Sequence, residues 1–175
     1  MSVSSTTFRE ALSHFASGVV IVAAYAPADP VGFTASAFTS VSLEPPLVLV
    51  CISKRASAYP GIVGATKFGI SILHETQLWI AEQFARHGAA RFAGVQLRRD
   101  AQTPLVEGAL AQLECAPHAL HDAGDHTIVV GRVVEAFYRP ARPLLHYQRA
   151  FGGFVGGAAF AYANGVGDGP NGGAP

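Results

Sequence analysis

The chain has 175 residues, half of them hydrophobic but only 14% charged, and its 12 basic and 12 acidic side chains balance. This length favours a single domain, and the balance leaves no basic excess to hold a nucleic-acid backbone. The high apolar content excludes a disordered chain, and no apolar run reaches the roughly 18 residues of a membrane span. A soluble domain usually carries about 25% charged residues, so the low charge calls for an explanation.

The first residues show no basic stretch followed by an apolar core, which argues against a signal peptide. Cys51 and Cys115, the two cysteines, lie far apart in apolar, strand-like runs, where a free thiol behaves as a small buried side chain. We therefore expect a reduced, cytoplasmic protein. We expect a folded domain over residues 6–160 and a disordered, Gly-rich tail over residues 161–175.

The first half of the chain predicts one helix and three strands. Thr7 and Glu10 fit a capping box, and apolar residues follow at helical spacing, which predicts an amphipathic helix over residues 8–17. Strands are predicted over residues 19–25, 32–42 and 47–52, separated by proline-containing turns. The last of these is a continuous apolar run, typical of a strand buried on both faces.

The second half predicts three strands, a helix and a loop-rich stretch. The helix spans residues 76–86, with Leu78, Ala81 and Phe84 on its inner face. The strands span residues 68–73, 109–116 and 126–138; a short helix or loop is expected over 57–64, loops over 89–104, and a last short element over 143–151. The order is not βαβ, so the sequence predicts a mainly β protein built as a mostly antiparallel barrel. No Gly-x-Gly-x-x-Gly motif opens a helix after a strand, which disfavours a Rossmann fold.

Two segments carry polar groups suited to a ligand. Residues 32–42 hold five hydroxyl side chains, which can hydrogen-bond a flat heteroaromatic ring or a phosphate. The alternative is a solvent-facing antiparallel strand, where Thr and Ser are ordinary. Residues 53–57 follow the apolar strand with two cations and two hydroxyls, which suits a phosphate or, equally, a polar surface loop.

A third segment, Gly124-Asp125-His126, opens the longest predicted strand after a turn. It is either a hairpin with a surface histidine or a histidine placed at the mouth of a barrel. His118 and His121 lie nearby, but their spacing is not that of a metal site with a third fixed ligand, so no metal is expected. No nucleophile, metalloprotease or phosphate-loop motif supports a hydrolase.

Taken in order, these segments resemble the short-chain flavin reductase family, the reductase partners of two-component flavin monooxygenases. The resemblance covers roughly residues 8–152. It rests on the collinear segments Phe8–Leu12, Phe15–Val19, Gly32–Phe38, Ser40–Val48, Phe84-Ala85, Arg91-Phe92, Leu113–Cys115, Gly124–Thr127 and Pro143–Leu145.

The resemblance implies an FMN-binding-type split barrel of six to seven antiparallel strands with peripheral helices, assembled as a homodimer. It implies hydride transfer from NADH or NADPH to FMN or FAD, with reduced flavin passed to a monooxygenase. The cofactor-binding residues that it implies are Phe33, Thr34, Ala35, Ser36, Ser40, Val41, Ser42, Cys51, Ile52, Ser53, Lys54, Ser57, Arg91 and Phe92. His126 is the residue that it places near the nicotinamide, as the catalytic residue.

Two other functions stay open at this stage. One is a non-enzymatic FMN-binding or electron-transfer barrel, and the other is a heme- or metal-binding barrel that uses His118, His121 and His126. The low charge is consistent with a homodimer, because a monomeric barrel of this composition would expose much apolar surface.

Overall fold

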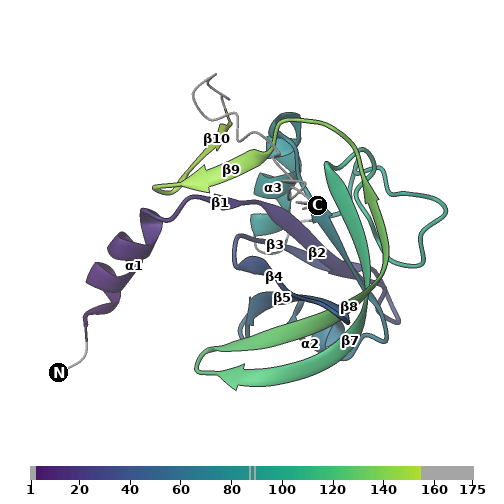
Figure 1. Ribbon diagram of the computed structural model, residues 1–175, viewed down its shortest axis with the longest axis horizontal. Coiled ribbons are helices and arrows are strands. Elements are labelled where there is room, and N and C mark those ends of the chain that lie inside the picture. Colours follow the sequence, from purple (N-terminus) through teal and green to yellow (C-terminus); the bar gives the residue numbers. More distant parts are fainter. Residues whose placement is uncertain (1–2, 87, 89, 155–175) are drawn as a thin grey trace, which may run out of the picture.

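The computed structural model describes residues 3–86, 88 and 90–154 (Figure 1). The predicted tail at residues 161–175, and residues 155–160 of the predicted domain, lie outside this range. The helices are α1 (Ser5–Ser13), α2 (Tyr59–Val63), the 3-10 turn η1 (Glu75–Gln77) and α3 (Leu78–Ala85). The strands are β1 (Ser17–Gly18), β2 (Val20–Ala24), β3 (Val31–Ala35), β4 (Phe38–Leu43), β5 (Pro46–Ser53), β6 (Phe68–Ile72), β7 (Ala111–Ala123), β8 (His126–Tyr138), β9 (Leu144–Tyr147) and β10 (Ala150–Gly153).

Seven of these strands form a curled antiparallel sheet in the order β3-β2-β6-β7-β8-β5-β4 (Figure 1). The predicted mainly β, antiparallel barrel with peripheral helices is therefore confirmed. The single strand predicted over residues 32–42 is wrong: it is two strands, β3 and β4, which occupy opposite edges of the sheet. The chain bends at Ser36 and Ala37, where the Ala37 carbonyl accepts a hydrogen bond from the Cys51 amide at 3.1 Å, and so moves from the neighbour of β2 to the neighbour of β5.

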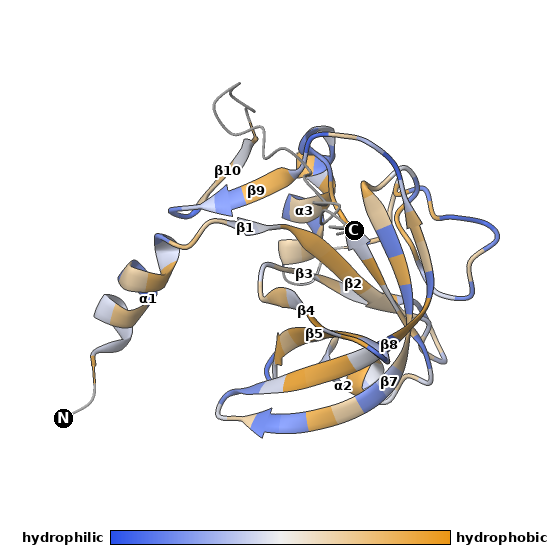
Figure 2. Ribbon diagram, viewed as in Figure 1, coloured by the Kyte–Doolittle hydropathy of each residue, from blue (hydrophilic) through white to orange (hydrophobic). Residues whose placement is uncertain are grey.

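The core has two parts, on either side of β2. One fills the barrel and includes Val22, Val50 and Phe68, and the other lies between β2 and α3. All five residues of β2 are buried, and Figure 2 shows the strand as a continuous hydrophobic band. The prediction that residues 47–52 are buried on both faces is wrong. In β5 the burial alternates, because Val48, Val50 and Ile52 face the barrel interior while the opposite face stays partly exposed.

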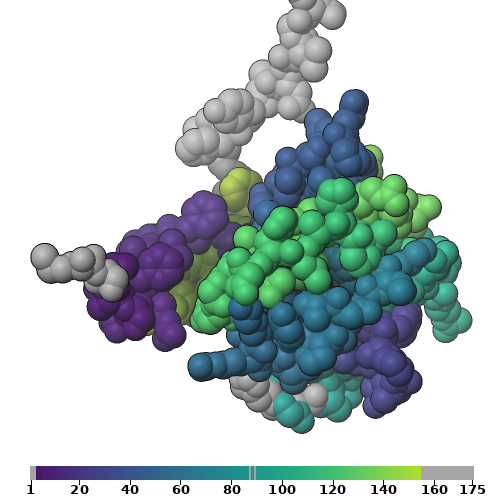
Figure 3. All heavy atoms as spheres, turned by 90° about the horizontal axis from the view of Figure 1, so that it is seen from below, coloured from purple at the N-terminus to yellow at the C-terminus, as the bar shows by residue number. Residues whose placement is uncertain are grey.

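Helix α1 stands away from the barrel at one side of the molecule (Figures 1 and 3). Its N-cap is Ser4, whose hydroxyl accepts from the Thr7 amide at 3.1 Å, so the capping box predicted for Thr7 and Glu10 is wrong. No residue of α1 is buried, and the side chains of Phe8 and Leu12 are 52% and 56% exposed. The periodicity therefore predicted the apolar face correctly, but within the described residues this face is left largely exposed and borders a groove shared with β4 and β5.

A second, three-stranded sheet in the order β1-β9-β10 anchors α1. The turn between β9 and β10 holds Gln148 and Arg149 at positive φ values of 47° and 62°. The Gln148 amide donates to the Ser13 carbonyl at 2.9 Å, and Arg149 forms an ion pair of 2.7 Å with Glu10. This turn therefore fixes the direction in which α1 leaves the barrel. None of the helices within the described residues is long and apolar enough to cross a membrane.

Candidate functional site

A pocket of about 340 Å³ opens where the end of β3 meets the ends of β5 and α3. We call it the Ser36 pocket. Nine residues expected to bind cofactor or act in catalysis line it: Phe33, Thr34, Ala35, Ser36, Cys51, Ser53, Ser57, Arg91 and His126. Four more lining residues, Ala37, Ala56, Phe84 and Ala85, were not among those expected. Small and hydroxyl side chains therefore make most of its wall.

The edge of β3 that faces away from β2 supplies backbone groups to this pocket. β3 is an edge strand, and the Gly32 carbonyl accepts from Arg91 rather than from β2. Because groups alternate in direction along an antiparallel strand, the amide and carbonyl of Thr34 also point away from β2. The Thr34 hydroxyl is not free for a ligand, since it donates to the Ala81 carbonyl of α3 at 2.6 Å. Thr34 thus offers its backbone, and its side chain ties β3 to α3.

Arg91 brings a positive charge to the wall of the Ser36 pocket. One terminal nitrogen donates to the Gly32 carbonyl and to the Ser57 hydroxyl, both at 3.0 Å. The other two guanidinium nitrogens donate to the Arg86 carbonyl at 3.3 and 3.1 Å. These contacts use four of the five guanidinium N–H groups. Within the described ranges no carboxylate forms an ion pair with Arg91, so the site holds a fixed cation ready for an anion.

Gln83 of α3, which sequence reasoning missed, holds the segment that carries Arg91. Its side-chain amide donates to the carbonyls of Arg91 at 2.7 Å, Ala93 at 2.9 Å and, more weakly, Ala90 at 3.4 Å. The Phe92 ring packs edge-to-face on Phe84, with centroids 4.9 Å apart. A lone glutamine on a helix carries no sequence signal for such a role, because its acceptors lie seven to ten residues later in the chain.

His126 lies at the first position of β8, opposite Ser53 of β5. Its Nδ1 pairs with the Asp125 carboxylate at 2.8 Å, and this hydrogen bond holds the pKa of Asp125 below its ordinary value. The turn before it is tied to β5 by Lys54, which contacts Asp122 at 2.8 Å and donates to the Gly124 carbonyl at 2.7 Å. Among the described residues none forms a hydrogen bond with the Nε2 atom of His126, which leaves this atom available to a ligand in the pocket.

Six of the expected cofactor-binding residues lie outside the Ser36 pocket: Ser40, Val41, Ser42, Ile52, Lys54 and Phe92. The first three are on β4, which the bend at Ser36 and Ala37 carries to the other edge of the sheet. The Ile52 side chain is fully buried in the barrel core. The Lys54 ammonium is neutralised by Asp122, so it positions the turn before His126 instead of lining the pocket.

The two cysteines are free and differ in their surroundings. Cys51 lines both the Ser36 pocket and a groove of about 570 Å³ beside α1, and burial raises the pKa of its thiol. Cys115 is buried in the barrel core, where burial and the nearby Glu114 raise the pKa of its thiol to about 12. In the part of the chain that the structure describes, no three His, Cys, Asp or Glu residues gather as a metal site.

A barrel of seven antiparallel strands, with a pocket at its mouth that is lined by small and hydroxyl side chains and one arginine, has the architecture of the cofactor-binding split barrels. A model of the flavin reductase like domain matches residues 12–154. The FMN reductase (NADH) of Agrobacterium fabrum is 43% identical over 151 residues, which is 86% of this chain and 86% of that protein. The reductase component of the Thermus thermophilus 4-hydroxyphenylacetate 3-monooxygenase is 44% identical over 145 residues, 82% of this chain and 93% of that protein.

Solved structures agree with this assignment. The NADH:FAD oxidoreductase of Streptomyces globisporus, in complex with NAD and FAD fragments, superposes with a TM-score of 0.82 at 37% identity, over 87% of this chain and 94% of that one. The chain belongs to the flavin reductase-like family, and both the resemblance drawn from the sequence and the split-barrel fold are confirmed.

Proposed function

We propose that the chain binds FMN or FAD in the Ser36 pocket and reduces it with NADH or NADPH, releasing reduced flavin to a partner monooxygenase. One observation carries this assignment: the Arg91 cation, which no carboxylate of the described residues pairs, the outward-facing backbone of Thr34 on β3, and His126 meet in a single pocket. The family members named above are NADH-dependent reductases or a monooxygenase reductase component. A non-enzymatic flavin barrel is therefore not favoured.

The residues present fit a flavin. Alanines, phenylalanines and hydroxyl side chains suit a flat ring, and the Thr34 backbone offers a donor and an acceptor to its polar edge. Arg91 and the Ser57 hydroxyl suit a phosphate. When bound, flavin and nicotinamide carry the hydride chemistry themselves, so the protein needs to supply only binding and orientation. The pocket accordingly needs no paired carboxylates.

We assign His126 to the nicotinamide side of the pocket. Asp125 fixes the ring by accepting from Nδ1, which directs Nε2 toward a ligand. His126→Ala should therefore lower NADH-dependent turnover much more than it lowers flavin affinity. Equal losses in both quantities would move the residue from the nicotinamide to the flavin. Lys54→Met, which releases the turn but keeps the imidazole, is the control for simple displacement of His126.

Steady-state kinetics test the function directly. Purified protein with excess FMN or FAD should consume NADH or NADPH over many turnovers, followed by the loss of nicotinamide absorbance. Four pairings of flavin and nicotinamide give the preferred substrates in one experiment. If neither flavin supports consumption of either nicotinamide, the proposed function is wrong.

We further propose that the chain is a cytoplasmic homodimer in which the apolar face of α1 is covered by a second copy. The support is the exposure of Phe8 and Leu12 on α1, of Phe15 just after the helix, 76% exposed, and of Leu43 on β4, 89% exposed. The free thiols of both cysteines are in keeping with a reducing compartment. Light scattering at micromolar concentration should give twice the monomer mass, and Leu12→Glu should shift it to the monomer. A monomeric native protein would contradict the dimer.

A further inference from the structure

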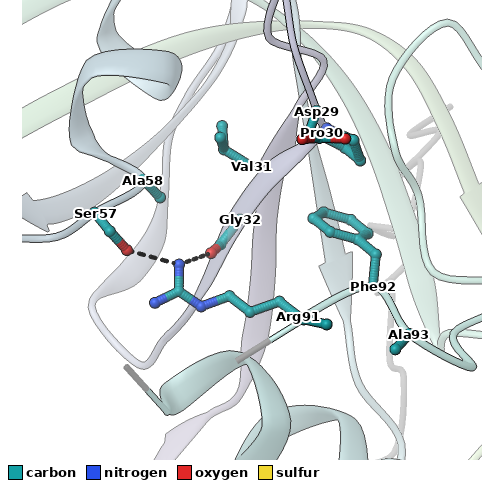
Figure 4. Close-up of a pocket in the computed structure, with 10 residues that line it drawn as sticks. Asp29, Pro30, Val31, Gly32, Ser57, Ala58, Arg91, Phe92 and Ala93 are labelled. Atoms are coloured by element: carbon teal, nitrogen blue, oxygen red, sulfur yellow. Dashed lines mark hydrogen bonds between the residues drawn. The ribbon is translucent and has the colours of Figure 1, made fainter. Parts of the chain in front are cut away.

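The Ser36 pocket takes its cation and its histidine from different parts of the barrel. Arg91 is held on the β3 side, where Figure 4 shows the Gly32 carbonyl and the Ser57 hydroxyl facing one guanidinium nitrogen. His126 enters the pocket from β8, and three strands, β2, β6 and β7, separate β8 from β3 in the sheet. Among the described residues no hydrogen bond joins His126 to Arg91 or Ser57. The space between the two charged groups therefore depends on other contacts.

Helix α2, which follows Ser57 almost directly, belongs to the β3 side. The helix packs against β2 and β3, and its Ile62 side chain is buried in the barrel core. A Cβ atom added at Gly61 would lie 2.6 Å from a methyl group of Val31, so the helix backbone lies very close to β3. Ser57 is therefore carried with the Arg91 side of the pocket.

Tyr59, the first residue of α2, reaches across to β8. Its hydroxyl oxygen lies 3.0 Å from the hydroxyl oxygen of Thr127, the residue that follows His126. Thr127 is 6% exposed, and the Tyr59 side chain packs partly buried against the barrel core. In the described part of the chain, neither hydroxyl makes another hydrogen bond. One bond thus joins the segment beside Ser57 to the residue beside His126.

The other hydrogen bonds of this segment do not make the same connection. Lys54, through its amide and its ammonium group, ties the end of β5 to the turn before β8. The amides of Ala56 and Tyr59 donate to carbonyls three residues earlier, at 2.9 Å each, and so hold only their own turns. Of the hydrogen bonds within the described ranges, the Tyr59 bond is therefore the one that fixes α2 to β8.

We propose that Tyr59 is a positioning residue that determines the spacing between Arg91 and His126 through its bond to Thr127. Tyr59 does not line the Ser36 pocket, so it acts without touching a ligand. The inference rests on the proposed function, in which the flavin phosphate lies at Arg91 and the nicotinamide at His126. Hydride transfer needs reacting atoms about 3–3.5 Å apart, and a displacement of about 1 Å can slow a reaction by about a hundredfold.

Rapid mixing of flavin-loaded protein with saturating NADH measures this alignment, as the rate at which flavin absorbance is lost. Tyr59→Phe keeps the ring and removes the hydroxyl, so we expect the rate to fall by about tenfold or more. FMN affinity should stay close to the native value, because Arg91 keeps its contacts with Gly32 and Arg86.

Variants of Thr127 test whether the hydrogen bond itself is responsible. Thr127→Val should slow flavin reduction as much as Tyr59→Phe does, and the double variant should be no slower than either, because all three lack the same bond. Thr127→Ser keeps a hydroxyl and should retain most of the native rate. Additive losses in the double variant would contradict the proposal, because they would assign the effects to two separate contacts.

Tyr25→Phe is the matched control, because Tyr25 is 54% exposed and does not line the Ser36 pocket. If Tyr59→Phe reduces flavin as fast as Tyr25→Phe, the proposal is wrong, even if Tyr59→Phe melts at a lower temperature. A purely structural role would lower the melting temperature and leave the reduction rate unchanged.

Amide hydrogen exchange of the ligand-free protein gives a second readout that does not depend on catalysis. In Tyr59→Phe the amides of residues 54–58 should exchange faster than in Tyr25→Phe, because α2 has lost its bond to β8. Equal exchange in the two variants would contradict the proposal, whatever the reduction rate.

The two readouts separate failure of this inference from failure of the proposed function. A native protein that reduces flavin, with neither rate nor exchange altered in Tyr59→Phe, keeps its function and loses the positioning role of Tyr59. A native protein that reduces neither flavin, with faster exchange in Tyr59→Phe, loses the proposed function and keeps Tyr59 as the link between the two sides of the pocket.

Discussion

Replacing Gln83 by leucine should loosen the segment that carries Arg91 while leaving the barrel folded. The substitution removes two short hydrogen bonds, to the carbonyls of Arg91 and Ala93, and one long bond to Ala90. A hydrogen bond contributes about 1 kcal/mol net to folding, so the two short bonds together contribute about 2 kcal/mol. For a domain of this size, that loss lowers the melting temperature by about 4–8 °C.

The effect on ligand binding should be of similar or larger size. Arg91 reaches an anion only while residues 90–93 hold their position, and a hydrogen bond to a charged group is worth about 1.5–3 kcal/mol. Flavin affinity of Gln83→Leu should therefore fall by about tenfold or more. Thermal unfolding and a fluorescence titration with FMN measure the two quantities on one preparation.

Gln96→Leu is the matched control, because the Gln96 side chain is exposed and does not line the Ser36 pocket. If Gln83→Leu and Gln96→Leu melt together and bind FMN equally, then Gln83 does not position Arg91, and the reasoning fails. A drop in melting temperature with unchanged affinity would give Gln83 a purely structural role.

Three further outcomes follow from burial. In Gly131→Ala the new methyl group would lie 2.5 Å from the buried Phe68 ring, so we expect the free energy of unfolding to fall by about 1–3 kcal/mol in urea denaturation. The pKa of the Cys115 thiol is raised to about 12, so Cys115 should resist thiol reagents near pH 8 in the native protein and react after unfolding. Burial lowers the pKa of His74 below its ordinary value of about 6.5, so the neutral ring is favoured in the folded state. Its contribution to stability is therefore complete above about pH 6.5 and is lost as the pH falls from there through the lower pKa of the folded state, which urea midpoints at a series of pH values would show.

Each of these three has a control in the chain. Gly152→Ala adds a methyl group with no atom within 4 Å and should be neutral; equal effects at both glycines would remove the steric argument. A Cys51→Ser background leaves Cys115 as the single thiol, and rapid native labelling would contradict its burial. His74→Asn keeps a side-chain acceptor at the N-cap of η1 and should weaken the pH dependence; an unchanged profile would assign the titration elsewhere.

Local patterns were enough for the elements whose ends are fixed by nearby residues. Strand β8 begins and ends at the predicted residues 126 and 138. Its start is fixed locally, because Gly124, at a φ of 67°, closes a tight turn immediately before it. The division of residues 32–42 could not be predicted in this way. Both halves have strand-like composition, and the bend between them depends on a hydrogen bond from Cys51, a residue of another strand.

The division of residues 32–42 into β3 and β4 also separates the site residues that the structure brings together from those that it does not. Residues 33–36 and Arg91 were expected to lie together, and the structure brings them into one pocket. The family resemblance also implied Ser40–Ser42 as cofactor-binding residues, and these residues lie on β4, at the opposite edge of the sheet from β3. Periodicity gave the apolar face of α1 but not its neighbours, since it says which residues gather on a face and nothing of what covers it.

The three-stranded sheet β1-β9-β10 also determines when α1 can be anchored during synthesis of the chain. β1 pairs with β9 between Ser17 and His146, and the turn that holds α1 is at Gln148 and Arg149. Chains leave the ribosome N-terminal end first, so α1 is the first element made and the last to receive its anchor. All seven barrel strands have emerged by Tyr138. The barrel can thus close before α1 is held in place. A nascent chain that pauses between Tyr138 and His146 has a complete set of barrel strands and an α1 helix that nothing anchors yet.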